Sequence, residues 1–367
     1  MTNNNSNIQV IKAKIIAIGS CGSNILVDFI RNKQLRDISY LFVNSKSAGN
    51  TLRLLNPSQT LLLDDKSKEL GFELNPDLAE RAALLAEQEI KTQLADSKLL
   101  FILAGMGGAT GTGASHIFAK VAKTLKSMTI AIVVEPFDFE DQKRLSIASE
   151  GIEKLQKNSD ALIVISNTKI QKQFEGIIVS EVWKKANQII FDIVKTIIDL
   201  ISKPAFMQID FSILKKAIRN NKKLFVNSGI GFGKHIGDRA KRAAISALND
   251  SIIDFDFKQT KEVIIIISVK NSFIEENEEI VKTIIEFLES KGARNFEYSV
   301  GIYLAPELDE NIKVGLIISA DENTQNLKLQ LDYEIQKEPQ VFEEEIQDTK
   351  LEQDDDDDFL NPFTADF

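Results

Sequence analysis

The stretch that decides the fold reads Ala104-Gly105-Met106-Gly107-Gly108-Ala109-Thr110-Gly111-Thr112-Gly113-Ala114. It follows an apolar run at 99–104 and opens a stretch of helical spacing at 114–125. Small residues let a backbone approach a polyphosphate, and the N–H groups at a helix start attract its negative charge. The two threonines add hydroxyl donors. The order of strand, glycine-rich turn and helix therefore predicts a phosphate-binding turn in preference to a merely flexible loop.

Strands and helices alternate on both sides of this turn. Runs that are apolar on both faces are typical of a buried parallel sheet, and they lie at 15–18, 40–43, 99–104, 129–134 and 162–165. Helical spacing lies between them, at 24–32, 77–94, 114–125 and 142–155. This alternation predicts an α/β fold, with a doubly wound parallel-sheet domain over 12–179 whose ligands bind beyond the carboxyl ends of the strands.

The second half of the chain predicts a different arrangement. Apolar residues repeat at intervals of three and four from 180 to 203, so we expect a connecting helix of roughly 30 Å that is covered on two sides. Helical patterns at 238–248 and 278–290, with apolar runs at 263–269, 296–303 and 313–318, predict a smaller α+β domain over 204–320. We expect a disordered N-terminus at 1–11 and an acidic linker with a terminal peptide at 321–367.

Composition and charge narrow the class of protein. The chain has 367 residues, 43% of them hydrophobic, which is enough for more than one packed core. From Asp321 onward there are 16 acidic and 3 basic residues of the totals 54 and 44, which leaves 38 acidic and 41 basic residues before it. The folded part is therefore near neutral, and because it has no basic groove we expect no nucleic-acid partner.

The expected compartment follows from sequence features of localisation. A single cysteine permits no intrachain disulfide and fits a reducing compartment. Residues 1–10 carry no secretory pattern, and the most apolar run, 263–269, is too short to cross a bilayer. We expect a soluble, cytoplasmic protein with no direct membrane insertion.

Other chemistries have less support. No Lys-Ser/Thr pair follows the glycine-rich turn, and the G-x-G-x-x-G fingerprint with its acidic ribose contact is missing. A dinucleotide-dependent enzyme stays open only as a weaker alternative. The two histidines, His116 and His235, lie far apart in the sequence, so we expect neither a metal site made of protein ligands nor a histidine-based triad.

The glycine-rich turn resembles the tubulin-signature loop of the FtsZ/tubulin family, G-M-G-G-G-T-G-T-G, with Ala109 in place of one glycine. Other segments match along nearly the whole folded region, so the chain resembles a divergent FtsZ. The resemblance implies GTP and Mg²⁺ as ligands and head-to-tail polymerisation into filaments of the division ring. It further implies that a loop of the neighbouring subunit completes the GTPase site.

The resemblance also implies which residues bind the nucleotide. The first phosphate loop corresponds to Ser20, Cys21, Gly22, Ser23 and Asn24, and the signature loop contributes Gly107, Gly108, Ala109, Thr110, Gly111, Thr112 and Gly113. Asn44 follows the second strand, Glu140 and Arg144 correspond to the ribose segment, and Asn167 corresponds to a position near the base. Read without the resemblance, Cys21 is a small packed residue, and Glu140 and Arg144 form an ion pair on one helix face.

The start of the long helix carries the predicted base contacts. In the family an aromatic residue stacks on guanine and an Asp or Asn reads its edge, and these positions hold Trp183 and Asn187 here. An amide offers both an acceptor and a donor, so Asn187 can read guanine. A core position between two domains is an equally weighted alternative for Trp183.

The loop after the long helix departs from the family. FtsZ has Asn-x-Asp-x-x-Asp there, whose carboxylates orient the attacking water, whereas this chain has Gln208, Asp210 and Ile213. The resemblance thus implies Asp210 and Gln208 as catalytic residues and a slow GTPase. Glu73 adds a negative charge to the γ-phosphate loop, which Lys46 would offset. The alternative is a non-hydrolysing GTP-binding paralogue that acts as a filament scaffold or regulator.

The C-terminal tail ends in a short apolar motif. Asp354–Asp358 form an acidic run, and Phe359-Leu360-Asn361-Pro362-Phe363 follows it. Apolar anchors in a polar tail favour docking to a partner. By resemblance, that partner is a membrane-tethering division protein, although the motif lacks the family's basic residue; a frayed terminus is the alternative.

Overall fold

The computed structural model describes residues 11–32, 38–46, 57–64, 75–174, 176–203, 205–218, 222–248, 257–270 and 276–320. The chain divides into one unit at Met1–Glu322 and a second at Asn323–Phe367, and every described residue belongs to the first. The predicted terminal peptide and Glu73 lie outside the described residues.

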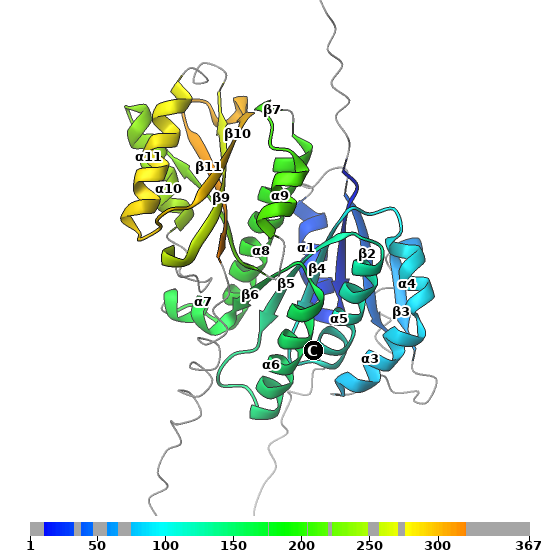
Figure 1. The fold of residues 1–367 in the computed structure, drawn as a ribbon. Coiled ribbons are helices and arrows are strands. Elements are labelled where there is room, and N and C mark those ends of the chain that lie inside the picture. Colours follow the sequence, from blue (N-terminus) through cyan, green and yellow to red (C-terminus); the bar gives the residue numbers. More distant parts are fainter. Residues whose placement is uncertain are drawn as a thin grey trace, which may run out of the picture. The chain divides into compact units, whose positions relative to one another are not determined.

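Six parallel strands form the first part of the sheet, in the order β3-β2-β1-β4-β5-β6 (Figure 1). Their bounds are β1 Ala13–Ile18, β2 Ser39–Ser45, β3 Thr60–Leu63, β4 Leu99–Gly105, β5 Met128–Glu135 and β6 Ala161–Ser166. At the end of β1, Ile18 lies between Val43 of β2 and Ala104 of β4. The strand order reverses between β1 and β4, and ligands of doubly wound sheets bind at such a switch point.

Helices cover both faces of this sheet because alternate strand residues point to opposite sides. Ile16 and Ile18 belong to one core with α3 Pro76–Leu85, α4 Glu87–Leu94, α5 Ala109–Thr124 and α6 Gln142–Asn158. Ile15 and Ala17 belong to the other core, with α1 Gly19–Asn32, α7 Asn167–Gln173 and α8 Val179–Ser202. The predicted doubly wound α/β domain is confirmed.

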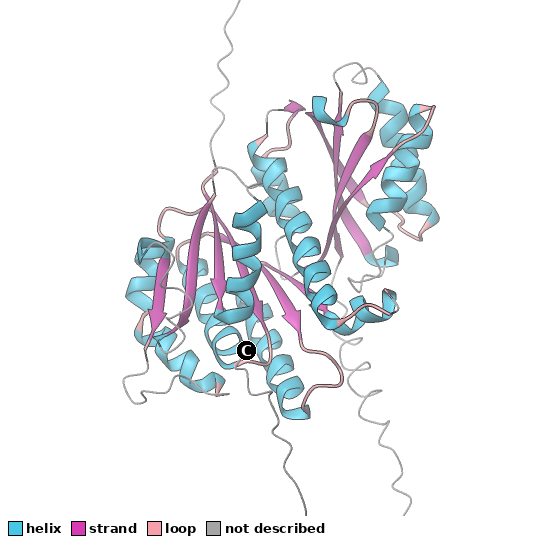
Figure 2. Ribbon diagram, turned by 180° about the vertical axis from the view of Figure 1, so that it is seen from behind, coloured by secondary structure: helices cyan, strands magenta, loops and turns pink. Residues whose placement is uncertain are grey.

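A mixed sheet follows, in the order β8-β11-β9-β10-β7, and it joins the first through Ala161 and Leu162 of β6 (Figure 2). Its strands are β7 Ala205–Met207, β8 Lys222–Gly231, β9 Thr260–Val269, β10 Glu297–Leu304 and β11 Ile312–Ala320. The helices α10 Ile236–Leu248 and α11 Asn277–Ser290 lie on one face, and α8 and α9 Phe211–Ile218 lie on the other (Figure 1). This confirms the predicted α+β part.

Several element boundaries differ from the sequence predictions. α1 begins at Gly19, so residues 20–24 form its first turns and not a loop before it. The single helix predicted at 77–94 is two helices that meet at Ala86. The short strands β3 and β7 were not predicted, because four and three residues show no clear periodicity.

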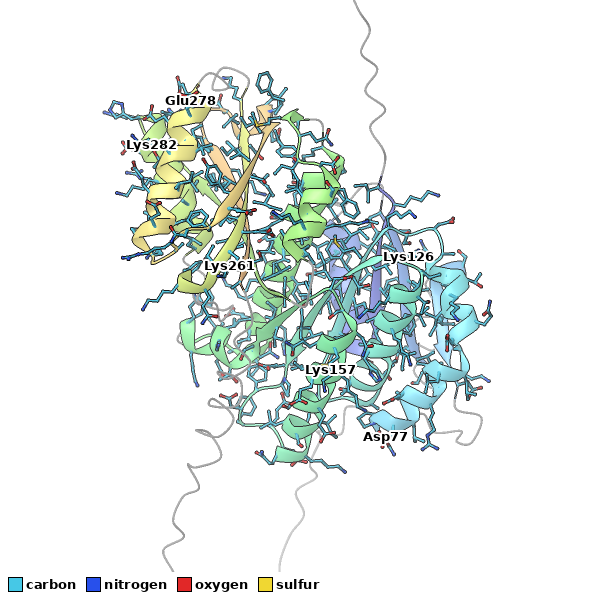
Figure 3. All side chains as sticks on the ribbon, in the orientation of Figure 1. Asp77, Lys126, Lys157, Lys261, Glu278 and Lys282 are labelled. Carbon is cyan, nitrogen blue, oxygen red and sulfur yellow. The ribbon has the colours of Figure 1, made fainter. Side chains whose placement is uncertain are left out.

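The labelled charged side chains Asp77, Lys126 and Lys157 are exposed on the outside of these layers (Figure 3). None of the helices in the described part of the chain combines the length and the apolar character needed to cross a membrane.

Candidate nucleotide-binding site

The N-termini of two helices meet at the switch point between β1 and β4. α1 begins at Gly19 directly after β1, and α5 begins at Ala109, with three residues between it and the end of β4. Gly19 has a φ of +75°, and a Cβ placed on it would lie 3.2 Å from the Gly111 nitrogen. A Cβ on Gly22 would lie 2.2 Å from the Leu103 carbonyl oxygen, so only glycine permits this approach. The free N–H groups of two first turns are thus presented together, which favours an anion.

The signature segment is held in shape by one of its own threonines. The Gly107 N–H donates to Thr112 Oγ1 at 3.0 Å, and Gly107 has a φ of +89°. Thr112 is buried, and its methyl group occupies the space beside Gly151. The hydroxyl oxygen of Thr112 therefore stabilises the turn, and a direct bond from it to nucleotide stays a prediction.

The predicted ribose segment lies against the same turn. Arg144 Nε lies 3.2 Å from Glu140 Oε2, which confirms the ion pair expected from their spacing. Glu140 Oε1 accepts a hydrogen bond from the Phe137 N–H at 2.8 Å. A Cβ on Gly107 would lie 2.7 Å from Arg144 Cγ, so the stem of Arg144 crosses the glycine-rich turn. The structure therefore brings the Glu140–Arg144 pair to the glycine-rich turn.

Cys21 packs on the end of β4. A Cβ on Gly105 would lie 2.6 Å from Cys21 Cβ and 2.9 Å from its Sγ. The residue is accessible to solvent, yet protein atoms surround the thiol and raise its pKa to about 11, an effect that Arg144 partly offsets. The thiol is therefore protonated at neutral pH, in agreement with the packing role and not with a reactive thiolate.

Two buried polar atoms of the predicted nucleotide-binding residues have no hydrogen-bond partner among the described residues. They are Ser23 Oγ in α1 and Asn167 Oδ1 at the start of α7, and each residue is 5% exposed. Asn44 differs, because its Oδ1 accepts a hydrogen bond from the Ser45 N–H at 2.9 Å. An unsatisfied buried polar group is costly, so Ser23 and Asn167 fit a site that a polar ligand completes.

The predicted base contacts lie on α8, and one of them, Asn187, contacts α1. Trp183 is 53% exposed, which excludes the alternative of a core position between domains. Asn187 Nδ2 donates to Asp28 Oδ2 at 3.4 Å. Asp28 was not predicted from the sequence, although it lies four residues after Asn24 on the same face of α1 and could have been found from that spacing.

The described residues offer little for a metal ion by themselves. They contain no group of three or more His, Cys, Asp or Glu side chains that could hold one. Lys46 Nζ pairs with Asp64 Oδ2 at 3.1 Å, so its charge already has a partner on the surface. Mg²⁺ commonly takes most of its ligands from phosphates and water, and such a site needs few protein carboxylates.

The predicted catalytic loop lies beyond the other end of α8. Gln208 and Asp210 are exposed, whereas Ile209 is buried. Asp210 Oδ1 accepts a hydrogen bond from the Ser212 N–H at 2.6 Å, and the Ser212 side chain and backbone lower the pKa of Asp210. Ile213, on the first turn of α9, packs against the hydrophobic core. The helix between Asn187 and Ser202 is about 22 Å long at 1.5 Å per residue, so one chain does not bring this loop to its own base-contact residues.

Comparisons with known proteins agree with this geometry. The tubulin/FtsZ family, GTPase domain, matches residues 12–175. The cell division protein FtsZ of Buchnera aphidicola subsp. Baizongia pistaciae is 31% identical over 326 residues, which cover 85% of this chain and 82% of the relative. The cell division protein FtsZ 1 of Thermococcus kodakarensis is 31% identical over 315 residues, again with 85% and 82% coverage.

Solved structures show the same fold. An empty FtsZ dimer from M. jannaschii is 26% identical with a TM-score of 0.71, and the match covers 84% of this chain and 88% of that chain. The GDP-bound CetZ1 monomer of Haloferax volcanii is 17% identical with a TM-score of 0.73, over 89% of this chain and 100% of that chain, a likeness of fold alone. The chain therefore belongs to the tubulin/FtsZ family and carries its GTPase domain.

Proposed function

We propose that this chain is an FtsZ-like cell division GTPase that binds GTP, with Mg²⁺, at the switch point between β1 and β4. The observation that carries the proposal is the meeting of the α1 and α5 N-termini, together with two buried atoms, Ser23 Oγ and Asn167 Oδ1, that have no hydrogen-bond partner in the described part of the chain. The helix starts suit the phosphates. Asn167, Trp183 and Asn187 would contact the base, and Glu140 and Arg144 the ribose. Mg²⁺ would neutralise phosphate charge.

We propose further that the subunits assemble head to tail and that one subunit completes the site of the next. The separation of the loop Gln208–Asp210 from the base contacts along α8 supports this, as does the existence of a dimeric relative. Asp210 carries the charge that a water-orienting group needs, since hydrogen bonds from Ser212 favour its carboxylate form. The exposed Gln208 would assist by positioning the same water.

A second candidate is a GTP-binding scaffold that does not hydrolyse the nucleotide. The observation that favours it is Ile213, which stands at the family's second acidic position and packs into the core. An isoleucine neither accepts a hydrogen bond nor orients water. Removing a positioned catalytic group lowers rates by two or more orders of magnitude in general, so slow and absent turnover are both compatible with this loop.

Phosphate release from GTP, measured against protein concentration, separates the two candidates. Filament assembly is followed by light scattering in the same samples, for the unmodified chain and for Ile213→Asp. The matched control is Ile213→Asn, because asparagine has nearly the same shape as aspartate but carries no carboxylate. Thermal unfolding of each variant is needed as well, because a polar group replaces a core-packed side chain.

Each outcome supports one of the two candidate functions or refutes a specific part of the proposal. Turnover of the unmodified chain above a threshold concentration, lost in Asp210→Asn, supports the GTPase. Assembly with turnover only in Ile213→Asp supports the scaffold and identifies the missing carboxylate. A folded protein that binds no GTP would refute the nucleotide site itself, and retained turnover in Asp210→Asn would refute the role of Asp210.

We also propose that the protein acts at the division site and that Phe359–Phe363 docks on a membrane-tethering division protein. The apolar anchors after an acidic run support this. In cells that depend on this chain, a variant ending at residue 353 is expected to assemble in vitro but not to gather at the division site. Normal recruitment of the shortened chain would refute the docking role.

A further inference from the structure

The loop Gln208-Ile209-Asp210 is held by strand pairing on one side and by hydrogen bonds on the other. Before it, β7 pairs antiparallel with β10, with Met207 opposite Ile302 and Ala205 opposite Tyr303. After it, the Ser212 N–H bonds Asp210 Oδ1 and the Ile213 N–H bonds the Asp210 carbonyl at 3.0 Å. Between these points Ile209 is only 4% exposed, while Gln208 and Asp210 on either side are exposed. The buried side chain of Ile209 therefore anchors the middle of the loop.

Ile209 packs against one face of β10, next to Tyr303. A Cβ on Gly301 would lie 2.7 Å from Tyr303 Cε2 and 3.0 Å from Ile209 Cγ1. Gly301 and Tyr303 are two residues apart on one strand, so they share a face. Because glycine has no side chain, position 301 leaves room for the Tyr303 ring and the Ile209 side chain together.

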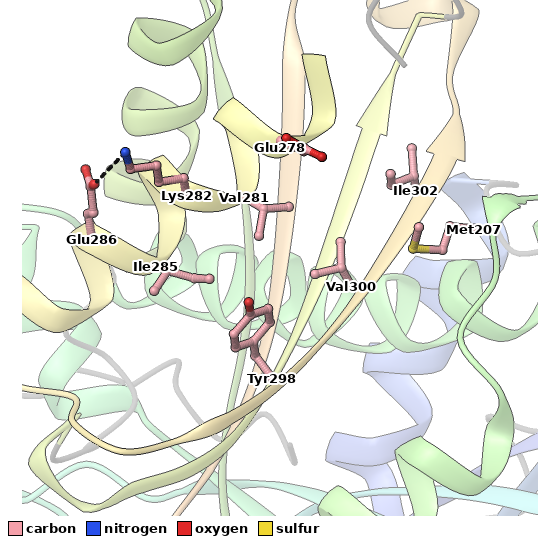
Figure 4. A pocket seen from close by; sticks show the side chains of 9 residues that line it. All are labelled: Met207, Glu278, Val281, Lys282, Ile285, Glu286, Tyr298, Val300 and Ile302. Atoms are coloured by element: carbon pink, nitrogen blue, oxygen red, sulfur yellow. Dashed lines mark ion pairs between the residues drawn. The ribbon is translucent and has the colours of Figure 1, made fainter. Parts of the chain in front are cut away.

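The opposite face of β10 is different. Tyr298, Val300 and Ile302 line a groove of about 440 Å³ with α11 and Met207, and they are drawn together in Figure 4. Tyr298 is exposed in this groove, whereas Tyr303 on the other face is only 1% exposed. The same strand therefore carries two tyrosines in opposite environments, one of which contacts the loop.

Tyr303 connects the loop to the end of α8. Its hydroxyl donates to the Leu200 carbonyl oxygen at 2.8 Å. A helical carbonyl normally accepts from the N–H four residues later, but residue 204 is a proline and has no N–H. Burial raises the pKa of this hydroxyl to about 12, and the neighbouring Ile209 backbone partly opposes the rise. Tyr303 thus bonds the end of α8 through its hydroxyl while its ring lies beside Ile209 at Gly301.

We propose that Tyr303 is a positioning residue for GTP hydrolysis, which holds the loop Gln208–Asp210 in place because its ring packs beside Ile209 while its hydroxyl bonds the last turn of α8. The role rests on the proposed catalytic function of that loop. Tyr303 itself is buried; it acts by holding the side chain of Ile209, and through it the two exposed neighbours. Catalytic groups lose much of their effect when they are displaced by about 1 Å.

The test compares Tyr303→Phe with Tyr298→Phe in the full chain. Each variant removes one hydroxyl from β10, and only the first removes the bond to the Leu200 carbonyl that fixes the ring beside Ile209. Hydrogen exchange of peptides covering 205–213, GTP affinity, assembled mass and turnover per assembled subunit are measured together. Turnover is also measured in the Ile213→Asp background, so that slow hydrolysis by the unmodified chain does not hide an effect.

Tyr303→Phe is expected to speed exchange across 205–210 about tenfold, the factor that corresponds to one lost hydrogen bond, and to lower turnover with unchanged GTP affinity and assembly. Tyr298→Phe is expected to change none of the four. Unchanged exchange in Tyr303→Phe, or faster exchange with unchanged turnover, would overturn the positioning role alone. Absence of turnover in both backgrounds would instead overturn the catalytic loop, and the role of Tyr303 in hydrolysis with it.

Discussion

The replacement Thr112→Val separates two roles for the signature threonine. Valine keeps the shape of the side chain and the methyl contact at Gly151, but it removes the oxygen that accepts the Gly107 N–H at 3.0 Å. That N–H is then left buried without a partner. The cost of such a loss is about 1–3 kcal/mol, and the free energy of unfolding of the nucleotide-free protein is expected to fall by this amount.

The effect on GTP follows from the same magnitude. If Thr112 acts only through the turn, the nucleotide-free and the GTP-bound protein lose the same hydrogen bond, so GTP affinity should fall by less than the 5-fold to 150-fold that corresponds to about 1–3 kcal/mol. Chemical denaturation without nucleotide and equilibrium GTP binding are the two assays. Thr110→Val is the control, because Thr110 is partly exposed beside Gly19; it should change stability by less than about 0.5 kcal/mol. Weaker GTP binding by Thr112→Val without any loss of stability would refute the reasoning and assign the hydroxyl to the nucleotide.

Three further predictions concern other contacts. Gly113→Ala should destabilise the protein by about 1–3 kcal/mol, because the new Cβ would lie 2.0 Å from the Pro76 carbonyl oxygen. Gly108→Ala, whose new Cβ would have no atom of another described segment within 4 Å, is the control in the same denaturation assay. Asp28→Ala should lower the preference for GTP over ATP about tenfold, since the Asn187 amide loses the acceptor that orients it. The ratio of GTP affinity to ATP affinity is measured by competition binding, and an equal ratio in the unmodified chain and the variant would contradict this. His116 has Nε2 3.3 Å from Glu80, which also pairs with Lys154, and burial lowers its pKa below 6.5 despite the opposing effect of Glu80. The unfolded chain therefore binds more protons just below pH 6.5, so stability should fall there as pH drops, and denaturation of His116→Gln at several pH values should show a smaller fall.

The sequence predicted the general architecture because its signals are local. Apolar runs and helical spacing are properties of short windows, and they located β1, β4, β5 and α8 to within a few residues. The glycine-rich turn was visible for the same reason, as was the Glu140–Arg144 pair, four residues apart at the start of α6. Departures from the family, such as Ile213, are also readable position by position.

Contacts between residues far apart in the sequence were decided by the tertiary structure alone. Only the strand order places Gly19 beside Gly111, and only the packing of α8 on α1 brings Asp28 to Asn187. The sequence presents Thr112 as one more hydroxyl near phosphate, whereas the fold turns its oxygen toward the Gly107 N–H. Tyr303 carries no local signal, since its hydroxyl bonds Leu200, 103 residues earlier in the chain. Periodicity reports which face of an element is buried, but the partner across that face depends on how distant elements pack, and no short window contains that information.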